Sequence, residues 1–498
     1  MIGRLSRLLS GKSGELAELL ILYFYSLSTA SPNPKDVVKM ASASDQTLGD
    51  LAMIFRRVIT SVERWGYQLN KSIRYMLGKI DDEDIRDFLK RLSDSATLSL
   101  DIGNFVKVEL ERMMAALVDE FERRLERVRK LVDAYSAILT SAAFLSVSML
   151  LVASIYGADV NRLLSATSIG ISTLLVLMSI LFARALPPDQ ILNDGQHLGN
   201  LRTLKNLATI MIPASTMSTL TLMLALSGSA NEVEAMALPL LSSGIPLIII
   251  GRLGLRWVKK AEEIDRSLPS LMKGLGDAVA VSGSLRAACK LILMNDYGSV
   301  NQHLRKLLKR LEMGFSQRLA LRAFGRELAS RLAYTMSSLM ADALHYGARG
   351  SVVGKAIHDY ALRRIENRKK RVQVAGMLWG IALPLQAIFA AISALISVLM
   401  KIMSSFAGLM SSWLPLITPI SEQSMNIFFL SITLGSAYAS AFSYYRVRGG
   451  SVFTFTYALG FLLAVSGAVY ALSSLVSQSI LGMAENLTRE INSLLGEL

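Results

Sequence analysis

The chain has 498 residues, of which 52% are hydrophobic and only 18% are charged. A typical soluble domain has about 25% charged residues, so this composition argues against a purely soluble protein. Lysine and arginine outnumber aspartate and glutamate by 53 to 39, a formal net charge of +14. Such a balance indicates membrane spans combined with a separate basic region. The single cysteine, Cys289, excludes an internal disulfide, and the four histidines are too scattered to indicate a metal cluster.

Seven stretches without Asp, Glu, Lys or Arg approach or exceed the roughly 20 apolar residues that a membrane helix needs. They are 134–158, 163–183, 206–231, 235–251, 372–400, 423–445 and 449–484. Their interiors also lack histidine. This weakens the case for a proton- or ion-coupled transporter, because such proteins usually hold charged groups within the membrane.

The distribution of basic residues predicts the topology. With the N-terminus in the cytoplasm, 50 of the 53 lysines and arginines fall on the cytoplasmic side, as the positive-inside rule requires. This orientation gives the chain four consecutive parts. They are a first cytoplasmic helical domain (1–133), membrane helices one to four (134–251), a second, strongly basic cytoplasmic helical domain (252–371), and membrane helices five to seven (372–498).

An eighth uncharged stretch, 402–421, contains Trp413, Pro415 and Pro419. Prolines and serines make it a poorer span than the other seven, so we expect an extracellular, interfacial or re-entrant segment near 402–422, with a full span as the alternative. Seven spans place the C-terminal tail outside the cell as well.

Both polar segments are predicted to be helical, because their apolar residues recur at spacings of three and four. The chain enters membrane helices through two similar basic runs, 123–130 and 363–370, at an offset of 240, and 88–92 resembles 307–311 at an offset of 219. These matches favour an all-α fold with two duplicated helical bundles. Separate juxtamembrane anchors are the alternative explanation of the basic runs.

Basic residues on the second polar segment form rows at helical spacing. Arg318, Arg322 and Arg326 are spaced by four, as are Arg305 and Lys309. Like charges at this spacing cost a helix about 0.2–0.5 kcal/mol per pair, so another role is expected. Three roles remain open: pairing with acids of a neighbouring helix, contact with an acidic protein partner, or contact with lipid headgroups or nucleic acid.

Two further groups of charged residues have specific expectations. The acidic run 81–84 precedes an apolar helical pattern, so Asp82 and Asp84 are expected at a helix start, where acids satisfy free N–H groups; an acidic partner-binding patch is the alternative. The basic residues next to the membrane entries are expected to contact anionic lipid. They are Arg123, Arg124, Arg127, Lys130, Arg363, Arg364, Arg368, Lys369 and Lys370.

Small residues four apart occur in three of the predicted spans and allow helices to approach closely. The pairs are Gly376 and Gly380, Gly435 and Ala439, and Gly467 and Ala471. Packing within the chain is the expectation, and association into a homodimer is the alternative.

Sequence signatures of catalysis are absent. No stretch satisfies the phosphate-binding pattern GxxxxGK[ST], and there is no HExxH zinc motif. We therefore expect a protein that is not an enzyme, with no catalytic residue, no cofactor and no metal ligand.

The pattern of two related helical cytoplasmic domains, each leading into membrane helices, resembles the platform proteins of type IV filament and type II secretion machines (the type II secretion system F-domain family). The stretches that carry this resemblance are 15–40, 51–76 and 265–291, together with the two basic runs. The number of spans is similar to that of the archaeal branch, which forms the platform of archaella and adhesion pili.

The resemblance implies a non-enzymatic scaffold of the cytoplasmic membrane. Its partners would be a hexameric cytoplasmic assembly ATPase, pilin subunits and membrane lipids, but not nucleic acid. Candidate contacts with the ATPase are Arg305, Lys309, Arg318, Arg322, Arg326, Asp82 and Asp84. A polytopic transporter or channel with cytoplasmic regulatory domains is the alternative function.

Overall fold

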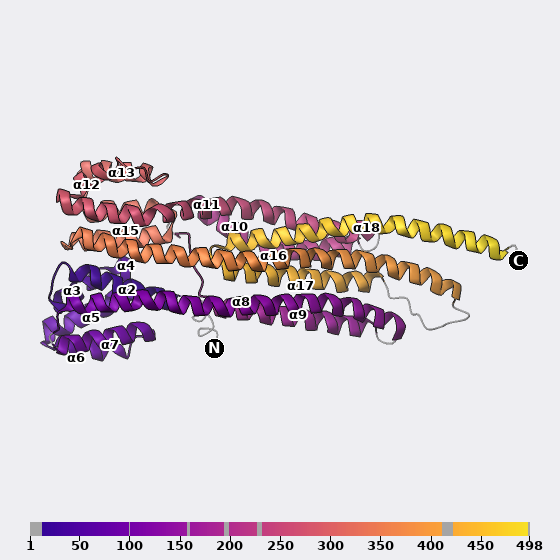
Figure 1. Ribbon diagram of the computed structural model, residues 1–498, viewed down its shortest axis with the longest axis horizontal. Coiled ribbons are helices and arrows are strands. Elements are labelled where there is room, and N and C mark those ends of the chain that lie inside the picture. The colour runs from indigo at the N-terminus through magenta and orange to yellow at the C-terminus, as the bar shows by residue number, and fades with distance from the viewer. Residues whose placement is uncertain are drawn as a thin grey trace. The chain divides into compact units, whose positions relative to one another are not determined.

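The computed structural model describes residues 12–98, 100–156, 160–193, 199–226, 232–410 and 422–496. Regular structure in these residues is helical, apart from an isolated bridge between Leu192 and Ser330. The predicted all-α fold is therefore confirmed. The helices, labelled as in Figure 1, are α2 (Lys12–Ser28), α3 (Pro34–Ser42), α4 (Asp45–Leu48), α5 (Asp50–Trp65), α6 (Leu69–Leu77), α7 (Glu83–Thr97), α8 (Ile102–Tyr156), α9 (Val160–Ala185), α10 (Gly199–Leu226), α11 (Glu232–Ser282), α12 (Leu285–Ile292), α13 (Val300–Glu312), α14 (Gln317–Glu327), α15 (Arg331–His345), α16 (Gly350–Met410), α17 (Glu422–Arg448) and α18 (Val452–Gly496).

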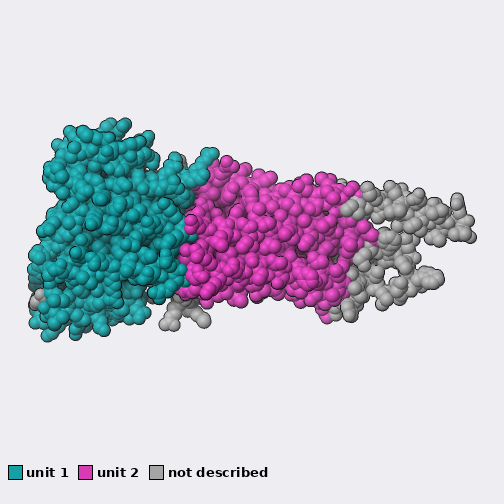
Figure 2. Space-filling view, viewed as in Figure 1, with its two compact units in different colours: residues 1–124, 187–202, 256–370 teal, residues 125–186, 203–255, 371–498 magenta. Residues whose placement is uncertain are grey.

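The chain forms two compact units, coloured separately in Figure 2. Unit 1 comprises Met1–Arg124, Pro187–Arg202 and Arg256–Lys370, and unit 2 comprises Leu125–Leu186, Thr203–Leu255 and Arg371–Leu498. Helices α8, α10, α11 and α16 contribute residues to both units. The two polar segments of the sequence therefore both belong to unit 1, where the sequence alone suggests two domains.

Seven helical stretches are long and apolar enough to cross a membrane, and each overlaps one of the seven predicted spans. They are Ile102–Val152, Val160–Ala185, Leu201–Leu226, Met236–Ser282, Gly350–Met400, Gln423–Arg448 and Val452–Ser477. The chain is thus a multi-pass membrane protein. The predicted interfacial segment continues α16 as far as Met410, and its remainder lies outside the described residues, whereas most of the predicted C-terminal tail continues α18.

Glycines bring α11 and α18 into backbone contact within unit 2. A Cβ added at Gly251 would lie 2.6 Å from the Cα of Tyr457, and one at Gly460 would lie 2.7 Å from the backbone nitrogen of Ile248. Any larger residue would push the two helices apart, because real Cβ atoms do not approach backbone this closely. The absence of a side chain at these positions sets the distance between the helices.

The three predicted small-residue pairs behave differently. A Cβ at Gly467 would meet Leu241 at 2.9 Å, and one at Gly435 would meet Ser172 at 3.0 Å, so packing within the chain is confirmed for these two glycines. A Cβ added at Gly376 or Gly380 would meet no atom of another described segment within 4 Å. The expectation of packing within the chain is therefore wrong for that pair.

Unit 1 contains a repeated helix order. Helices α14, α15 and α16 begin at one constant offset along the chain from α6, α7 and α8, respectively. The caps repeat at the same offset, since Asp82 caps α7 and Ser330 caps α15. Gly66 and Gly314, which are related by that offset too, both adopt the left-handed conformation, with φ of 69° and 83°. These correspondences support a duplicated helical bundle.

The register of this repeat differs from the offsets of 240 and 219 that the sequence matches suggest. The match between 88–92 and 307–311 aligns α7 with α13, which occupy different places in the helix order. Both matches consist mainly of Arg, Lys and Leu at helical spacing. That pattern is common to the surfaces of amphipathic helices, so it does not identify equivalent positions.

Aromatic side chains form part of the core of unit 1. The ring of Phe24 in α2 lies 5.4 Å from that of Phe55 in α5 and 5.6 Å from that of Phe88 in α7, and all three residues are buried. Burying each such side chain contributes about 1.5–3 kcal/mol. The amphipathic helices α5 and α7 of the first half of unit 1 (residues 1–124) therefore pack around the continuous apolar run 19–25 of α2.

Candidate functional site

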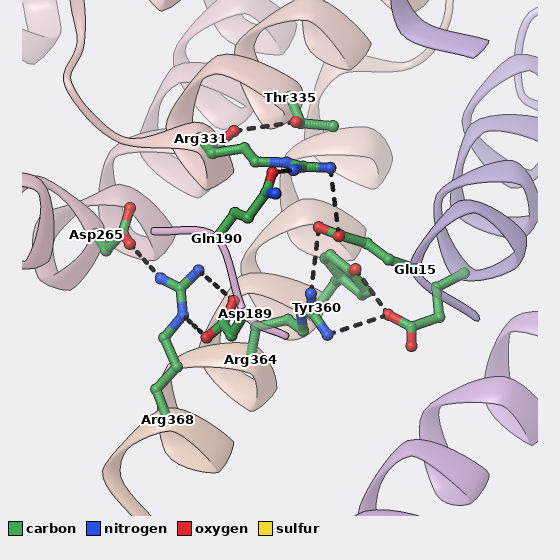
Figure 3. A network of polar contacts seen from close by, with 10 residues as sticks. Glu15, Asp189, Gln190, Asp265, Arg331, Thr335, Tyr360, Arg364 and Arg368 are labelled. Carbon is green, nitrogen blue, oxygen red and sulfur yellow. Dashed lines mark hydrogen bonds and ion pairs between the residues drawn. The ribbon is translucent and has the colours of Figure 1, made fainter. Parts of the chain in front are cut away.

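Charged side chains of α2 and α16 meet inside unit 1 (Figure 3). The guanidinium of Arg364 lies 3.2 Å from the carboxylate of Glu15 and 3.7 Å from that of Glu18. The Tyr360 hydroxyl donates to Glu18 at 2.8 Å, and Arg331 lies 3.5 Å from Glu15. Burial raises the pKa of the Glu18 carboxyl, and the charge of Arg364 opposes that shift. The cluster joins the first half of unit 1 (residues 1–124) to its second half (residues 256–370) through charges that are largely shielded from water.

Arg368 connects three segments of unit 1. Its guanidinium forms a bidentate pair with Asp189, at 2.6 and 3.1 Å, and an ion pair with Asp265 of α11. Asp265 also accepts a hydrogen bond from the Ser330 hydroxyl, the N-cap of α15. A two-oxygen contact with a planar guanidinium fixes both distance and orientation, so Arg368 holds Asp189 in a defined position (Figure 3).

The segment 187–193, which follows α9 in the chain, is attached to the junction between α14 and α15. The backbone N–H of Asn193 donates to the carbonyl of Ala329 at 2.8 Å, and the N–H of Arg331 donates to the carbonyl of Ile191 at 2.9 Å. Arg331 also donates to the Gln190 side chain. We call this segment the strap. The strap belongs to unit 1 and lies in the chain between two candidate spans, α9 and α10.

Asp342 is the centre of a second buried cluster. Its side chain is wholly buried. Its carboxylate pairs with the guanidinium groups of Arg318, at 2.8 Å, and Arg322, at 2.6 Å. Thr47 donates to the same carboxylate at 2.9 Å and Tyr23 donates at 3.3 Å, both from the first half of unit 1. Burial, together with the neighbouring charge of Asp342, raises the pKa of the Tyr23 hydroxyl well above its usual value.

This cluster decides between the roles that the sequence leaves open for Arg318 and Arg322. Both guanidinium groups pair with an acid of a neighbouring helix, α15. The structure therefore favours the first of the three roles, and we do not propose a contact of Arg318 or Arg322 with a partner protein. Arg305 and Lys309 are exposed on α13 and Arg326 is half-buried, and no ion pair of these three is present among the described residues.

The acidic run occupies the predicted helix start. The Asp82 carboxylate accepts from the backbone N–H of Asp84 at 3.0 Å and of Ile85 at 3.2 Å, so its capping role is confirmed. Asp84 is exposed in the first turn of α7. The pKa of Asp84 is nevertheless raised, because the helix removes part of the hydration of its carboxyl and the carboxylate of Asp82 lies nearby. Contact of both acids with a partner protein stays a prediction.

The juxtamembrane residues divide into two groups. Arg364 and Arg368, predicted to contact lipid, are instead held by internal carboxylates, because those acids, far away in the sequence, are brought beside them by the fold. Lys370 pairs with Glu122 at 2.6 Å, and Arg124 pairs with Glu120. The exposed remainder, which keeps the lipid prediction, consists of Arg123, Arg127, Lys130 and Lys369, with Arg363 half-buried.

The acids that organise these clusters were not singled out by sequence analysis. Asp342 sits in a helix whose other buried residues are Leu, Ala, Met and Ser. A lone acid in an apolar helix face is a usable signal, because a buried charge requires a partner. Asp189 and Asp265 carry no such signal, since each lies in a polar stretch. Within the described residues, no group of three or more His, Cys, Asp or Glu is placed to hold a metal ion.

The chain is distantly homologous to flagella accessory protein J of two archaea. It is 22% identical over 390 residues to the protein of Methanocaldococcus jannaschii, covering 76% of this chain and 69% of that protein. It is 20% identical over 380 residues to the protein of Methanococcus voltae, covering 74% and 68%. No family model and no solved structure matches the chain.

Proposed function

We propose that the protein is a non-enzymatic membrane platform for the assembly of an archaellum-like or type IV pilus-like filament. It couples a hexameric cytoplasmic ATPase to the insertion of pilin subunits or to the rotation of the filament. The observation that carries the proposal is the similarity to flagella accessory protein J over about three quarters of the chain. That length includes both membrane spans and polar segments.

The arrangement of unit 1 supports a coupling role. The strap joins two candidate spans and is held to unit 1 by two backbone hydrogen bonds and by the bidentate contact of Arg368 with Asp189. Contacts of this kind transmit displacement better than a flexible linker, because their geometry is fixed. A force on unit 1 would thus reach the membrane helices through the strap as well as through α8, α11 and α16.

We place unit 1 in the cytoplasm, with the N-terminus on the same side. The bias of Lys and Arg supports this orientation. Segments 1–133 and 252–371 then form the cytoplasmic face, with the membrane helices in 134–251 and 372–498. The exposed bases Arg305 and Lys309 of α13, with Arg326, are the proposed contacts for an acidic face of the ATPase, and Asp82 and Asp84 are secondary candidates.

The test is a gentle detergent purification of the tagged full-length chain from the membranes of filament-producing cells, with partners identified by mass spectrometry. Wild type should retain a secretion-type ATPase and pilin-like subunits. The double variant Arg305→Glu/Lys309→Glu should lose the ATPase, while Lys90→Glu, an exposed base on α7, should retain it. A wild-type preparation that lacks both partners would refute the platform, and solute flux through liposomes containing the chain alone would then support the transporter.

A further inference from the structure

Two turns of unit 1 expose large apolar side chains at equivalent positions. Trp65 and Tyr67 flank Gly66 between α5 and α6, and their exposed fractions are 71% and 56%. At the equivalent positions of the second half, Met313 and Phe315 flank Gly314 between α13 and α14, with exposed fractions of 67% and 53%. We call these turns the two tips.

The backbone holds each tip in a defined conformation. The glycine at its centre has a positive φ, which other residues rarely adopt. The N–H of Tyr67 donates to the carbonyl of Ser61 at 3.3 Å, and the N–H of Phe315 donates to the carbonyl of Arg310 at 3.1 Å. A side chain presented from a fixed turn loses less entropy on binding than one on a mobile loop.

Recurrence is the reason to assign a function to the tips. Single exposed apolar residues are common on protein surfaces. Here, however, the same arrangement of two large apolar residues around a left-handed glycine occurs in both halves, although the residue types differ. Trp, Tyr, Phe and Met are also the residues enriched at protein interfaces, and Trp and Tyr frequently dominate their binding energy.

The surroundings of the tips indicate the chemistry of the partner. The exposed bases Arg64 and Lys71 lie on the helices that flank the first tip, and the exposed base Lys309 lies on the helix that leads to the second. The acids nearest to the tips, Glu63 and Glu312, are paired with Lys39 and Lys290. The second polar segment has 24 basic and 10 acidic residues. A partner that accepts these tips would have apolar pockets with acidic rims.

We propose that the two tips dock into two equivalent, acid-rimmed apolar pockets on neighbouring subunits of a soluble oligomeric protein. Two similar tips on one chain fit a partner that presents the same pocket more than once, as a ring of identical subunits does. Two simultaneous contacts also strengthen binding beyond either one alone. This inference rests on the proposed function, in which the assembly ATPase is that oligomer.

The test compares tip variants with matched controls for binding of the ATPase that co-purifies with wild type. The variants Trp65→Ser/Tyr67→Ser and Met313→Ser/Phe315→Ser should each weaken binding about tenfold or more, and their combination should abolish it. The controls Tyr75→Ser and Met294→Ser remove side chains that are 74% and 81% exposed outside the tips and should bind as wild type does. Equal thermal unfolding temperatures would show that all variants are folded.

The outcomes separate the two proposals. If wild type and tip variants retain the ATPase equally, the docking role of the tips is wrong while the platform function stands. If wild type retains no ATPase, the platform function fails and this partner fails with it. A membrane is the competing occupant, and it is tested in liposomes containing brominated lipid. Trp379 lies in a candidate span and is expected to be quenched in every variant. Quenching in wild type that falls in Trp65→Phe by the share of that tryptophan would show that the first tip enters lipid, and would overturn the proposal.

Discussion

The two halves of unit 1 place the same ion pair in different surroundings. Arg74 and Asp94 join α6 to α7 at 2.7 Å, with side chains 60% and 45% exposed. The equivalent pair, Arg322 and Asp342, joins α14 to α15 at 2.6 Å, with side chains 12% and 0% exposed. An exposed pair contributes about 0–1 kcal/mol, whereas removing one partner of a buried pair costs about 3–5 kcal/mol. By this comparison, the burial of an ion pair, rather than its presence, determines how much it contributes to the free energy of unfolding.

The halves also differ in how they use basic residues. The first half is almost neutral, with 21 basic and 19 acidic residues in 1–132, whereas 252–371 has a net charge of +14. Part of this excess is neutralised by acids from outside the second half. Arg364 forms ion pairs with Glu15 and Glu18 of α2, and Arg368 forms an ion pair with Asp189 of the strap. Basic residues of the second half therefore bind other segments of unit 1 together.

The largest expected effect comes from the buried pair. Asp342→Asn should destabilise the protein by about 3–5 kcal/mol, because Arg318 and Arg322 both lose their counter-charge inside the fold. Asp94→Asn, at the equivalent exposed position, should cost no more than about 1 kcal/mol. Unfolding measurements in detergent would compare the two variants. Equal losses would show that exposure does not distinguish the halves.

The strap provides the next comparison. Arg368→Met should cost about 3 kcal/mol, because Asp189 and Asp265 lose the guanidinium that pairs with both, although protonation of one carboxyl limits the loss. Hydrogen exchange at the N–H groups of Asn193 and Arg331 should become faster. The equivalent position in the first half is Glu120, which pairs on the surface with Arg124. Glu120→Gln should cost only a few tenths of a kcal/mol and leave that exchange unchanged.

The second half of unit 1 also contains a close approach between helices that depends on a glycine. A Cβ at Gly354 would lie 2.8 Å from the carbonyl oxygen of Met272 and 3.1 Å from the Cα of Gly276, so Gly354→Ala should cost about 1–3 kcal/mol. Val106 occupies the equivalent place in the first half. The control Gly103→Ala meets only the Asp101 side chain, at 3.5 Å, and should be neutral or stabilise the helix by up to about 1 kcal/mol. Thermal unfolding of both variants would check this contrast.

The smallest expected effect is a dependence on pH. Burial alone would raise the pKa of Glu327, but the hydrogen bond and charge of Arg310 outweigh it and lower that pKa below its ordinary value of 4.5. Ionised Glu327 therefore stabilises the fold above pH 4.5, and this contribution is lost as the pH falls through the lowered value. Glu327→Gln should lower stability at neutral pH by less than about 1 kcal/mol. It should also reduce the decline seen in acid, and an unchanged acid profile would contradict the assignment.

Local features of the chain were predictable because their physical causes are local. The spans follow from runs of uncharged residues, and the cap of α7 follows from an acid placed just before an apolar helical pattern. The partners of Arg318 and Arg322 were not predictable in the same way. Asp342 lies 20 residues beyond Arg322 on another helix, and nothing in the spacing distinguishes an internal acid from one on a partner protein.

The sequence by itself determined the helical character, the seven spans and the basic excess of the second polar segment, since each depends on composition or short-range periodicity. Only the tertiary structure decided that both polar segments form one compact unit, that the repeat pairs α6, α7 and α8 with α14, α15 and α16, and that Arg364 and Arg368 face internal carboxylates. The physical reason is burial. The sequence supplies a charge at a given place, but only the packing of distant helices determines whether water, lipid or another side chain surrounds it.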